Sequence, residues 1–131
     1  MVKLILITHG ALGQALVDTA ASICCCAAQK KIDVFSISGK VNLGEIENKI
    51  KAVLGQDGGI ILVDTFGGTA CNVALKCAVN MANVSVIAGV NLSMLLTALS
   101  NYDKLPRKEL AAKIISDGNK AILEATEFVK K

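Results

Sequence analysis

The chain has 131 residues, of which 53% are hydrophobic and 19% charged, and its net charge at pH 7 is +3. This length is typical of one domain, so we expect residues 1–131 to form a single domain. The basic residues are scattered and only 3% of the chain is aromatic, which argues against nucleic-acid binding. No apolar run approaches the roughly 20 residues of a membrane span. The chain also opens on a strand pattern without a secretory leader, so we expect a cytoplasmic protein.

Four apolar runs of strand length alternate with segments of helical periodicity. The strands are expected at Leu4–Thr8, Ile32–Ile37, Ile60–Asp64 and Val84–Gly89. Strands that alternate with helices form parallel sheets through right-handed crossovers, and a small sheet of this kind is usually doubly wound. We therefore predict an α/β fold whose mainly parallel sheet has the strand order 2-1-3-4 and carries helices on both faces.

Helical periodicity fills the gaps between the predicted strands. The first three helices are expected at Leu12–Ala28, Leu43–Leu54 and Cys71–Met81. Asn42 is the predicted N-cap of the second helix because Glu45 follows it in the capping-box position, and Gly55 ends that helix.

The last third of the chain is expected to contain two helices, followed by a segment whose secondary structure the sequence does not decide. A short helix is expected at Asn91–Ser100, with Ser93 able to cap its start. Another helix starts at Arg107 and is expected to weaken near Asp117 and Gly118. The composition of Ala121–Val129 does not decide between a helix and an edge strand.

Five cysteines are present, three of them consecutive. Cys24, Cys25 and Cys26 point in different directions around a helix, so they form neither a CxxC pair nor half of a zinc site. Cys71 and Cys77 stand alone, and the odd total argues against a closed set of disulfides. We expect reduced, buried thiols and no metal site.

His9 is the only histidine, and it ends the first strand pattern at a glycine turn. In the strand order 2-1-3-4, the order reverses between strands 1 and 3, and the residues that end these strands line one crevice. Those residues are His9 and Asp64, and neighbouring strands lie only about 4.8 Å apart. A carboxylate beside an imidazole fixes its tautomer and leaves the other ring nitrogen as a nucleophile.

The turn that follows Asp64 has the composition of an anion site. Gly67 and Gly68 let backbone N–H groups face an anion at the start of the third helix, where the dipole is positive, and Thr69 adds a hydroxyl. Together with His9 and Asp64, this pattern predicts a site that accepts and passes on a phosphoryl group without a metal or other cofactor. Each part also has a structural interpretation: a hydrogen-bonded histidine, a capping aspartate and a tight βα turn.

Three segments, Ile7–Gly10, Val63–Thr69 and Ala88–Leu95, resemble the enzyme IIA domain of the mannose family of the bacterial sugar phosphotransferase system. The resemblance covers nearly the whole chain, and the segments follow in the family's order. It implies that His9 accepts phosphate from the histidine-containing phosphocarrier protein and passes it to an enzyme IIB partner for coupled sugar uptake and phosphorylation. It also implies that Asp64 orients the histidine and that Thr69 contacts the phosphoryl group.

The resemblance further implies a cytoplasmic homodimer in which a C-terminal segment adds an antiparallel fifth strand to the neighbour's sheet, and the segment from Ala121 onward fits that role. Two residues depart from the family pattern, because Ala70 and Ser93 stand where proline is usual. Each change removes a fixed φ, which affects loop rigidity and partner affinity but removes no phosphoryl ligand.

Two other functions stay open. The phosphocarrier subunit of a dihydroxyacetone kinase resembles the chain at the histidine strand, although the Asp64–Thr69 block favours the sugar-uptake branch. A regulatory module could keep the fold without transferring phosphate. A receiver domain is disfavoured, since no acidic cluster follows the first strand. The sugar is not specified, because selectivity would reside in the membrane partners.

Overall fold

The computed structural model describes residues 1–24 and 27–130. Its strands are β1 (Leu4–His9), β2 (Ile32–Ile37), β3 (Gly59–Val63) and β4 (Val84–Ala88). They form one sheet in which every neighbouring pair is parallel and the order is β2-β1-β3-β4. The predicted α/β fold and strand order are therefore confirmed.

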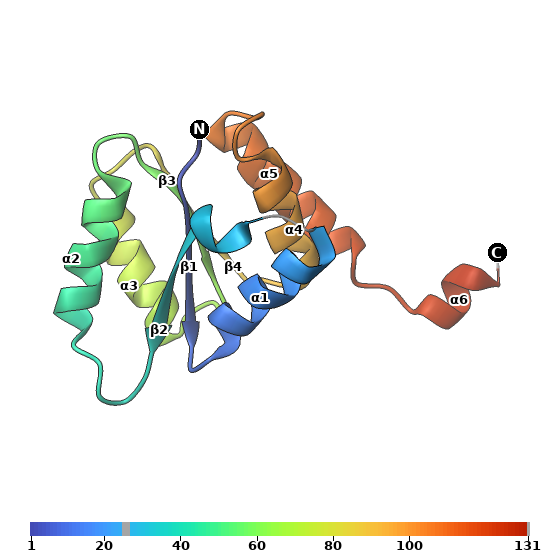
Figure 1. The fold of residues 1–131 in the computed structure, drawn as a ribbon, viewed down its shortest axis with the longest axis horizontal. Helices are drawn as coiled ribbons and strands as arrows, with labels where there is room; N and C mark the ends of the chain where they lie inside the picture. The colour runs from blue at the N-terminus through green and yellow to red at the C-terminus, as the bar shows by residue number, and fades with distance from the viewer. Residues whose placement is uncertain (25–26, 131) are drawn as a thin grey trace.

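Helices cover both faces of this sheet (Figure 1). They are α1 (Leu12–Cys24), the 3₁₀ turn η1 (Ala28–Lys30), α2 (Leu43–Leu54), α3 (Thr69–Ala78), α4 (Leu92–Asn101), α5 (Arg107–Lys120) and α6 (Ala125–Val129). Helices α1, α4 and α5 pack on one face, whereas α2 and α3 pack on the other. Within the described ranges, no helix is long and apolar enough to cross a membrane.

The central strands β1 and β3 are buried on both faces, which explains their unbroken apolar runs. Successive side chains of a strand point to opposite faces, so each face takes alternate residues. The face under α1, α4 and α5 takes Leu4, Leu6, Ile60 and Leu62. The face under α2 and α3 takes Ile5, Ile7, Ile61 and Val63. Residues that end these two strands are thus held by the best-packed part of the molecule.

Helices α1 and α3 differ from the prediction by two or more residues at three of their ends. The described part of α1 runs to Cys24, and the predicted end at Ala28 is wrong because Ala27 has a non-helical backbone with φ −82° and ψ 63°. The stretch of the predicted helix at 25–26 lies outside the described residues. Helix α3 begins at Thr69, two residues early, because the extended Gly68 serves as its N-cap. It ends at Ala78 rather than Met81.

The caps of α2 and α4 follow one rule. The Oδ1 atom of Asn42 accepts a hydrogen bond from the amide of Glu45 at 3.2 Å, as predicted. The expectation that Ser93 caps α4 is wrong, because the Oδ1 atom of Asn91 accepts from the amide of Met94 at 2.9 Å. An N-cap side chain reaches the amide two or three residues ahead, and Ser93 is already inside the first turn.

Helix α5 does not weaken near Asp117 and Gly118, contrary to expectation, and it continues to Lys120. Gly118 is buried against α4, where a Cβ atom would overlap the Cγ atom of Met94. Asp117 accepts a hydrogen bond from the hydroxyl of Thr97 at 2.8 Å. These contacts with α4 stabilise the turn where local helix propensity is poor.

The segment from Ala121 leaves the body of the molecule and ends in α6 (Figure 1). Every described residue of this segment is exposed. The choice between helix and edge strand is therefore resolved in the single chain as a short exposed helix, Ala125–Val129.

The cysteines behave in two ways. Cys71 and Cys77 are free and buried in α3, as predicted. Cys24 is disulfide-bonded, so the expectation of a free thiol is wrong at this position. Cys25 and Cys26 lie outside the described residues.

Candidate functional site

His9 and Asp64 lie side by side at the carboxyl edge of the sheet, where the strand order reverses between β1 and β3. His9 is the last residue of β1, and Asp64 directly follows the last residue of β3. The Nδ1 atom of His9 lies 2.8 Å from the Oδ2 atom of Asp64. The backbone amide of His9 donates to the same oxygen at 2.9 Å. The strand order thus brings together two side chains that are 55 residues apart in sequence.

The two partners differ in exposure and therefore in role. The side chain of Asp64 is 10% exposed and that of His9 is 48% exposed. Burial raises the pKa of the Asp64 carboxyl, but the hydrogen bonds from the His9 amide, the His9 ring and the Thr65 amide outweigh it and hold this pKa below its ordinary value. Asp64 is therefore ionised at neutral pH.

The ionised carboxylate of Asp64 determines which nitrogen of the neutral His9 ring carries the proton. A carboxylate only accepts hydrogen bonds, so the neutral ring of His9 carries its proton on Nδ1 and donates it to Asp64. The Nε2 atom then keeps its lone pair. The pair has the arrangement in which a positioned base or nucleophile is oriented by a third group.

Gly67 and Gly68 shape the turn beside the ring for different reasons. Gly67 has φ +82°, which residues with a side chain rarely adopt. Gly68 lies against the ring, since a Cβ atom there would be 3.3 Å from Cε1 and 3.9 Å from Nε2 of His9. Because Gly68 is also the N-cap of α3, the unpaired N–H groups and the positive dipole end of that helix lie close to Nε2.

Thr69 directly follows the glycine turn. It is the first residue of α3 and is half-buried. It lines the groove between α2 and α3, and among the described residues the hydrogen bonds of His9 go to Asp64. A contact between the Thr69 hydroxyl and a phosphoryl group therefore stays a prediction.

The sequence analysis missed Thr8, which holds the backbone next to His9. Thr8 is fully buried, and its Oγ1 atom accepts a hydrogen bond from the amide of Gly13 at 2.7 Å. On the other side of His9, the amide of Gly10 donates to the carbonyl of Ile37 at 3.0 Å. A hydroxyl residue at the end of a strand, just before a glycine turn, was the available signal.

Ala70 and Ser93, the two departures from the family pattern, occupy equivalent places. Each is the second residue of its helix, Ala70 in α3 and Ser93 in α4. Proline is tolerated in the first turn of a helix because the amides there have no intrahelical partner. Both helices therefore form their first turn without the fixed φ of proline.

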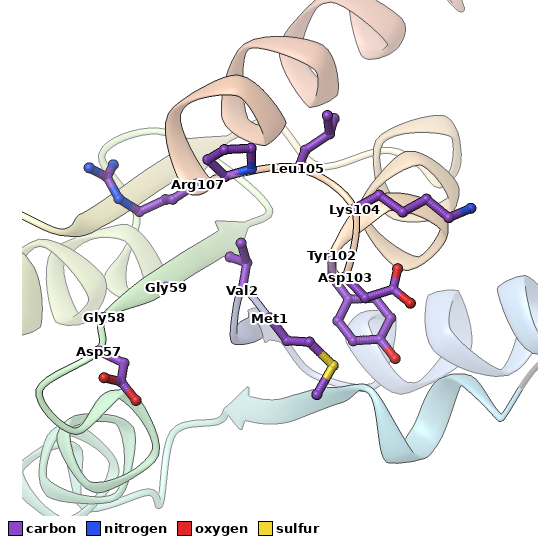
Figure 2. A pocket seen from close by; sticks show the side chains of 11 residues that line it. Met1, Val2, Asp57, Gly58, Gly59, Tyr102, Asp103, Lys104, Leu105 and Arg107 are labelled. Atoms are coloured by element: carbon purple, nitrogen blue, oxygen red, sulfur yellow. The ribbon is translucent and has the colours of Figure 1, made fainter.

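A pocket of about 440 Å³ lies at the opposite, amino edge of the sheet (Figure 2). Its basic side chains do not converge, because Lys104 and Arg107 extend to opposite sides of it. The guanidinium of Arg107 already donates to the hydroxyl of Ser85 and the carbonyl of Ala82. The part of the chain that the structure describes holds no cluster of three or more metal-ligating side chains. The His9–Asp64 pair is therefore the best candidate site.

Comparison with known proteins bears on the same site. A family model described as "PTS system fructose IIA component" matches residues 3–115. A "PTS system mannose-specific EIIAB component" of Escherichia coli (strain K12) is 29% identical over 126 residues. This match covers 92% of the chain and 38% of that relative, as does the match to the protein of the same name from Shigella flexneri. The chain thus spans little more than a third of the length of these curated relatives.

Two solved structures share the fold over almost their whole length. A mannose/sorbose specific IIA subunit of the phosphotransferase system from Enterococcus faecalis has a TM-score of 0.81 and 27% identity, with 94% of this chain and 93% of that chain covered. A phosphotransferase system component EIIA from Streptococcus agalactiae has a TM-score of 0.85 and 21% identity, with 97% and 99% covered.

Proposed function

This chain belongs to the EIIA-man family of phosphotransferase-system (PTS) enzyme IIA components, and from that premise we propose that it relays phosphoryl groups through phosphohistidine at His9. The family consists of phosphotransfer proteins, which supports a transferase-type role. The observation that carries the assignment to His9 is its 2.8 Å contact with Asp64, which occupies Nδ1 and leaves Nε2 as the nucleophile.

The transfer itself is an in-line displacement between two nitrogens. Nε2 of His9 attacks the phosphorus of a phosphohistidine on the donor protein. The bond from phosphorus to the donor nitrogen breaks, and its electron pair returns to the donor ring. The ring of His9 keeps its Nδ1 proton and so acquires positive charge, which the Asp64 carboxylate stabilises at hydrogen-bond distance.

The start of α3 is proposed to hold the phosphoryl oxygens. Gly68 lies beside Nε2 and leaves the space that a side chain would fill. Backbone N–H groups and the helix dipole favour an anion at such a position, and this charge compensation needs no metal. Gly67, Gly68 and the hydroxyl of Thr69 are the groups that we assign to this role.

We assign the histidine-containing phosphocarrier protein as the donor and an enzyme IIB as the acceptor, as the family resemblance implies. The name of the E. coli relative, an EIIAB component, supports a coupling of IIA with IIB. The matched names cite fructose, mannose and mannose/sorbose, and we assign no sugar to this chain.

We further propose a homodimer built through the C-terminal segment. Its side chains Ile122, Leu123, Phe128 and Val129 are exposed. Strand β4 is at an edge of the sheet, and an edge strand presents unpaired backbone groups. An antiparallel strand exchanged between two copies would cover both features. Sedimentation equilibrium is expected to give twice the mass of the chain. A monomer at about 100 μM would contradict this, since a Kd above that range is too weak for a stable dimer.

The relay is tested by charging the chain with phosphoenolpyruvate, enzyme I and the phosphocarrier protein. We expect one phosphoryl group per chain, labile in acid and stable in base, and mapped to His9 by mass spectrometry. His9→Ala is the matched variant and is expected to remain uncharged. If no adduct forms on the wild type, or if the adduct persists in His9→Ala, the relay through His9 is wrong and a regulatory module is favoured.

A further inference from the structure

A second pocket, of about 380 Å³, opens at the amino edge of the sheet beside the pocket of Figure 2. The two pockets are neighbours, because Met1, Val2 and Tyr102 line both of them. A volume of this size is typical of sites for small organic ligands. His9 ends β1 at the opposite, carboxyl edge, so a ligand of this second pocket would not contact His9.

This second pocket, here called the Lys31 pocket, carries an excess of positive charge. Its charged side chains are Lys3, Lys30, Lys31 and Asp33. Three lysines against one carboxylate leave the lining with a net charge of +2. Within the described ranges, none of these lysines forms an ion pair. The described part of the protein therefore leaves this charge for an anion from outside.

Two of the three ammonium groups are held against the walls of the Lys31 pocket. The Nζ atom of Lys3 donates to the carbonyl of Leu54, the last residue of α2, at 3.3 Å. The Nζ atom of Lys31 lies 5.5 Å from the centroid of the Tyr102 ring. An ammonium group has three N–H donors, so both lysines keep donors for a ligand. Side chains that are already held in place lose less entropy when a ligand binds.

The rest of the lining is apolar and is held by the protein core. It consists of Val2, Leu4, Val53 and the ring of Tyr102. Val2 and Tyr102 pack on the core under α1, α4 and α5, whereas Val53 packs on the core under α2 and α3. An apolar wall beside cations favours an anion with an apolar or flat body, because that body buries area that inorganic phosphate does not have.

We propose that the Lys31 pocket binds an organic phosphomonoester such as a nucleoside monophosphate, with the phosphate at the lysines and the body against Val53 and Tyr102. A phosphomonoester carries about two negative charges at neutral pH, which matches the +2 of the lining. A single carboxylate would leave half of that charge unmatched. Lysine is a common ligand of phosphate. The proposal does not depend on the phosphoryl relay, since the pocket and His9 are at opposite edges of the sheet.

The test is a titration with AMP in about 0.1 M NaCl, followed by NMR of the backbone amides. We expect a Kd below about 1 mM, with the shifted amides at residues 2–4, 30–33 and 102. Adenosine and inorganic phosphate are the matched fragments, and each should bind at least about tenfold more weakly because it makes only part of the contacts. No shift at about 10 mM AMP, or an equal affinity for inorganic phosphate, would overturn the proposal.

A pair of variants separates the site from general attraction by positive charge. Lys30→Gln/Lys31→Gln removes two of the three cations and should raise the Kd for AMP at least about tenfold. Lys104→Gln/Lys108→Gln is the matched control, because it removes the same charge from two exposed residues that do not line this pocket. Its Kd should stay within about threefold of wild type. Equal losses in the two variants would overturn the site.

His9→Ala separates this site from the anion position proposed at Gly68. It is expected to bind AMP with the Kd of the wild type, and a loss of AMP binding in this variant would place the ligand at the carboxyl edge and overturn the proposal. Phosphorylation of His9, by contrast, tests only the proposed function.

Vesicles of phosphatidylcholine with phosphatidic acid present the same phosphomonoester on a membrane. We expect no more binding to them than to phosphatidylcholine alone, because the body of a soluble ligand enters the pocket. Binding to these vesicles in the absence of AMP binding would show a membrane contact and would overturn the proposal of a soluble ligand.

Discussion

Asp64→Asn keeps the shape of the carboxylate and removes its charge. In the wild type, Asp64 accepts hydrogen bonds from the backbone amide of His9 at 2.9 Å, from Nδ1 of His9 at 2.8 Å and from the amide of Thr65 at 2.9 Å. A carboxamide offers one acceptor oxygen and one donor NH₂ group. In either orientation, therefore, at least one of these donors faces another donor.

The expected loss of rate follows from the bond to Nδ1. A hydrogen bond to a charged group contributes about 1.5–3 kcal/mol, and this one strengthens as the phosphorylated ring of His9 becomes positive. Removing the charge should slow phosphorylation of His9 by about 10- to 150-fold, since each 1.4 kcal/mol is a factor of ten. With the NH₂ group at the Oδ2 position, both the amide and Nδ1 of His9 lose their acceptor. With the NH₂ group at the Oδ1 position, the amide of Thr65 loses its acceptor and Nδ1 keeps an acceptor that carries no charge.

The assay is the initial rate of phosphoryl incorporation from phosphoramidate at neutral pH, with thermal unfolding measured in parallel to show that the variant is folded. Asp57→Asn is the matched control, because Asp57 is exposed and lines the pocket at the opposite edge (Figure 2). It is expected to react like the wild type. A folded Asp64→Asn that reacts within about twofold of wild type would refute the view that this carboxylate stabilises the charged ring.

Three further predictions concern stability. Because the pKa of Asp64 is lowered in the folded state, the carboxylate stabilises the fold above its unfolded pKa, and that stabilisation is lost as the pH falls through the folded pKa. The difference in free energy of unfolding between wild type and Asp64→Asn should therefore shrink below about pH 4. Urea unfolding at neutral and at acid pH measures this difference, and an equal difference at both pH values would contradict the prediction. Thr8→Val leaves the amide of Gly13 without an acceptor inside the core and should lower the free energy of unfolding by about 1–3 kcal/mol. Thr8→Ser should retain most of the stability. Equal urea midpoints for Thr8→Val and the wild type would show that the hydrogen bond contributes nothing. Gly118→Ala should lower the free energy of unfolding by about 1–2 kcal/mol, because the overlap of the new Cβ atom with Met94 costs more than the higher helix propensity of alanine contributes. Gly44→Ala, in the exposed first turn of α2, should stay within about 0.5 kcal/mol, and a Gly118→Ala variant as stable as wild type would disprove the close packing of α4 on α5.

The parts of the fold that could be predicted are those that depend on local pattern and chain topology. The run Ile60–Val63 indicates a strand because a strand covered on both faces is apolar at every position. The strand order is the one expected of a small doubly wound sheet, and the contact of His9 with Asp64 follows from that order. The core of the candidate site was therefore accessible from the sequence.

The parts that could not be predicted depend on contacts between distant residues. Gly118 is a poor helix residue by itself, and what stabilises it is Met94 on the neighbouring helix. Asn91 and Ser93 are both good caps, and only the point at which β4 ends decides between them. Likewise, the buried hydroxyl of Thr8 became informative only when its partner, the amide of Gly13, was known.

The ring of His9 is half-exposed and stands at one edge of the sheet. In a relay through this ring, the donor and the acceptor must both reach Nε2 and therefore bind at the same site one after the other. The cycle is then a ping-pong sequence without a ternary complex. An excess of unphosphorylated acceptor would compete with the donor for binding at His9 and slow the phosphorylation of His9. Each partner therefore limits the other's access to His9 without a conformational change in this chain.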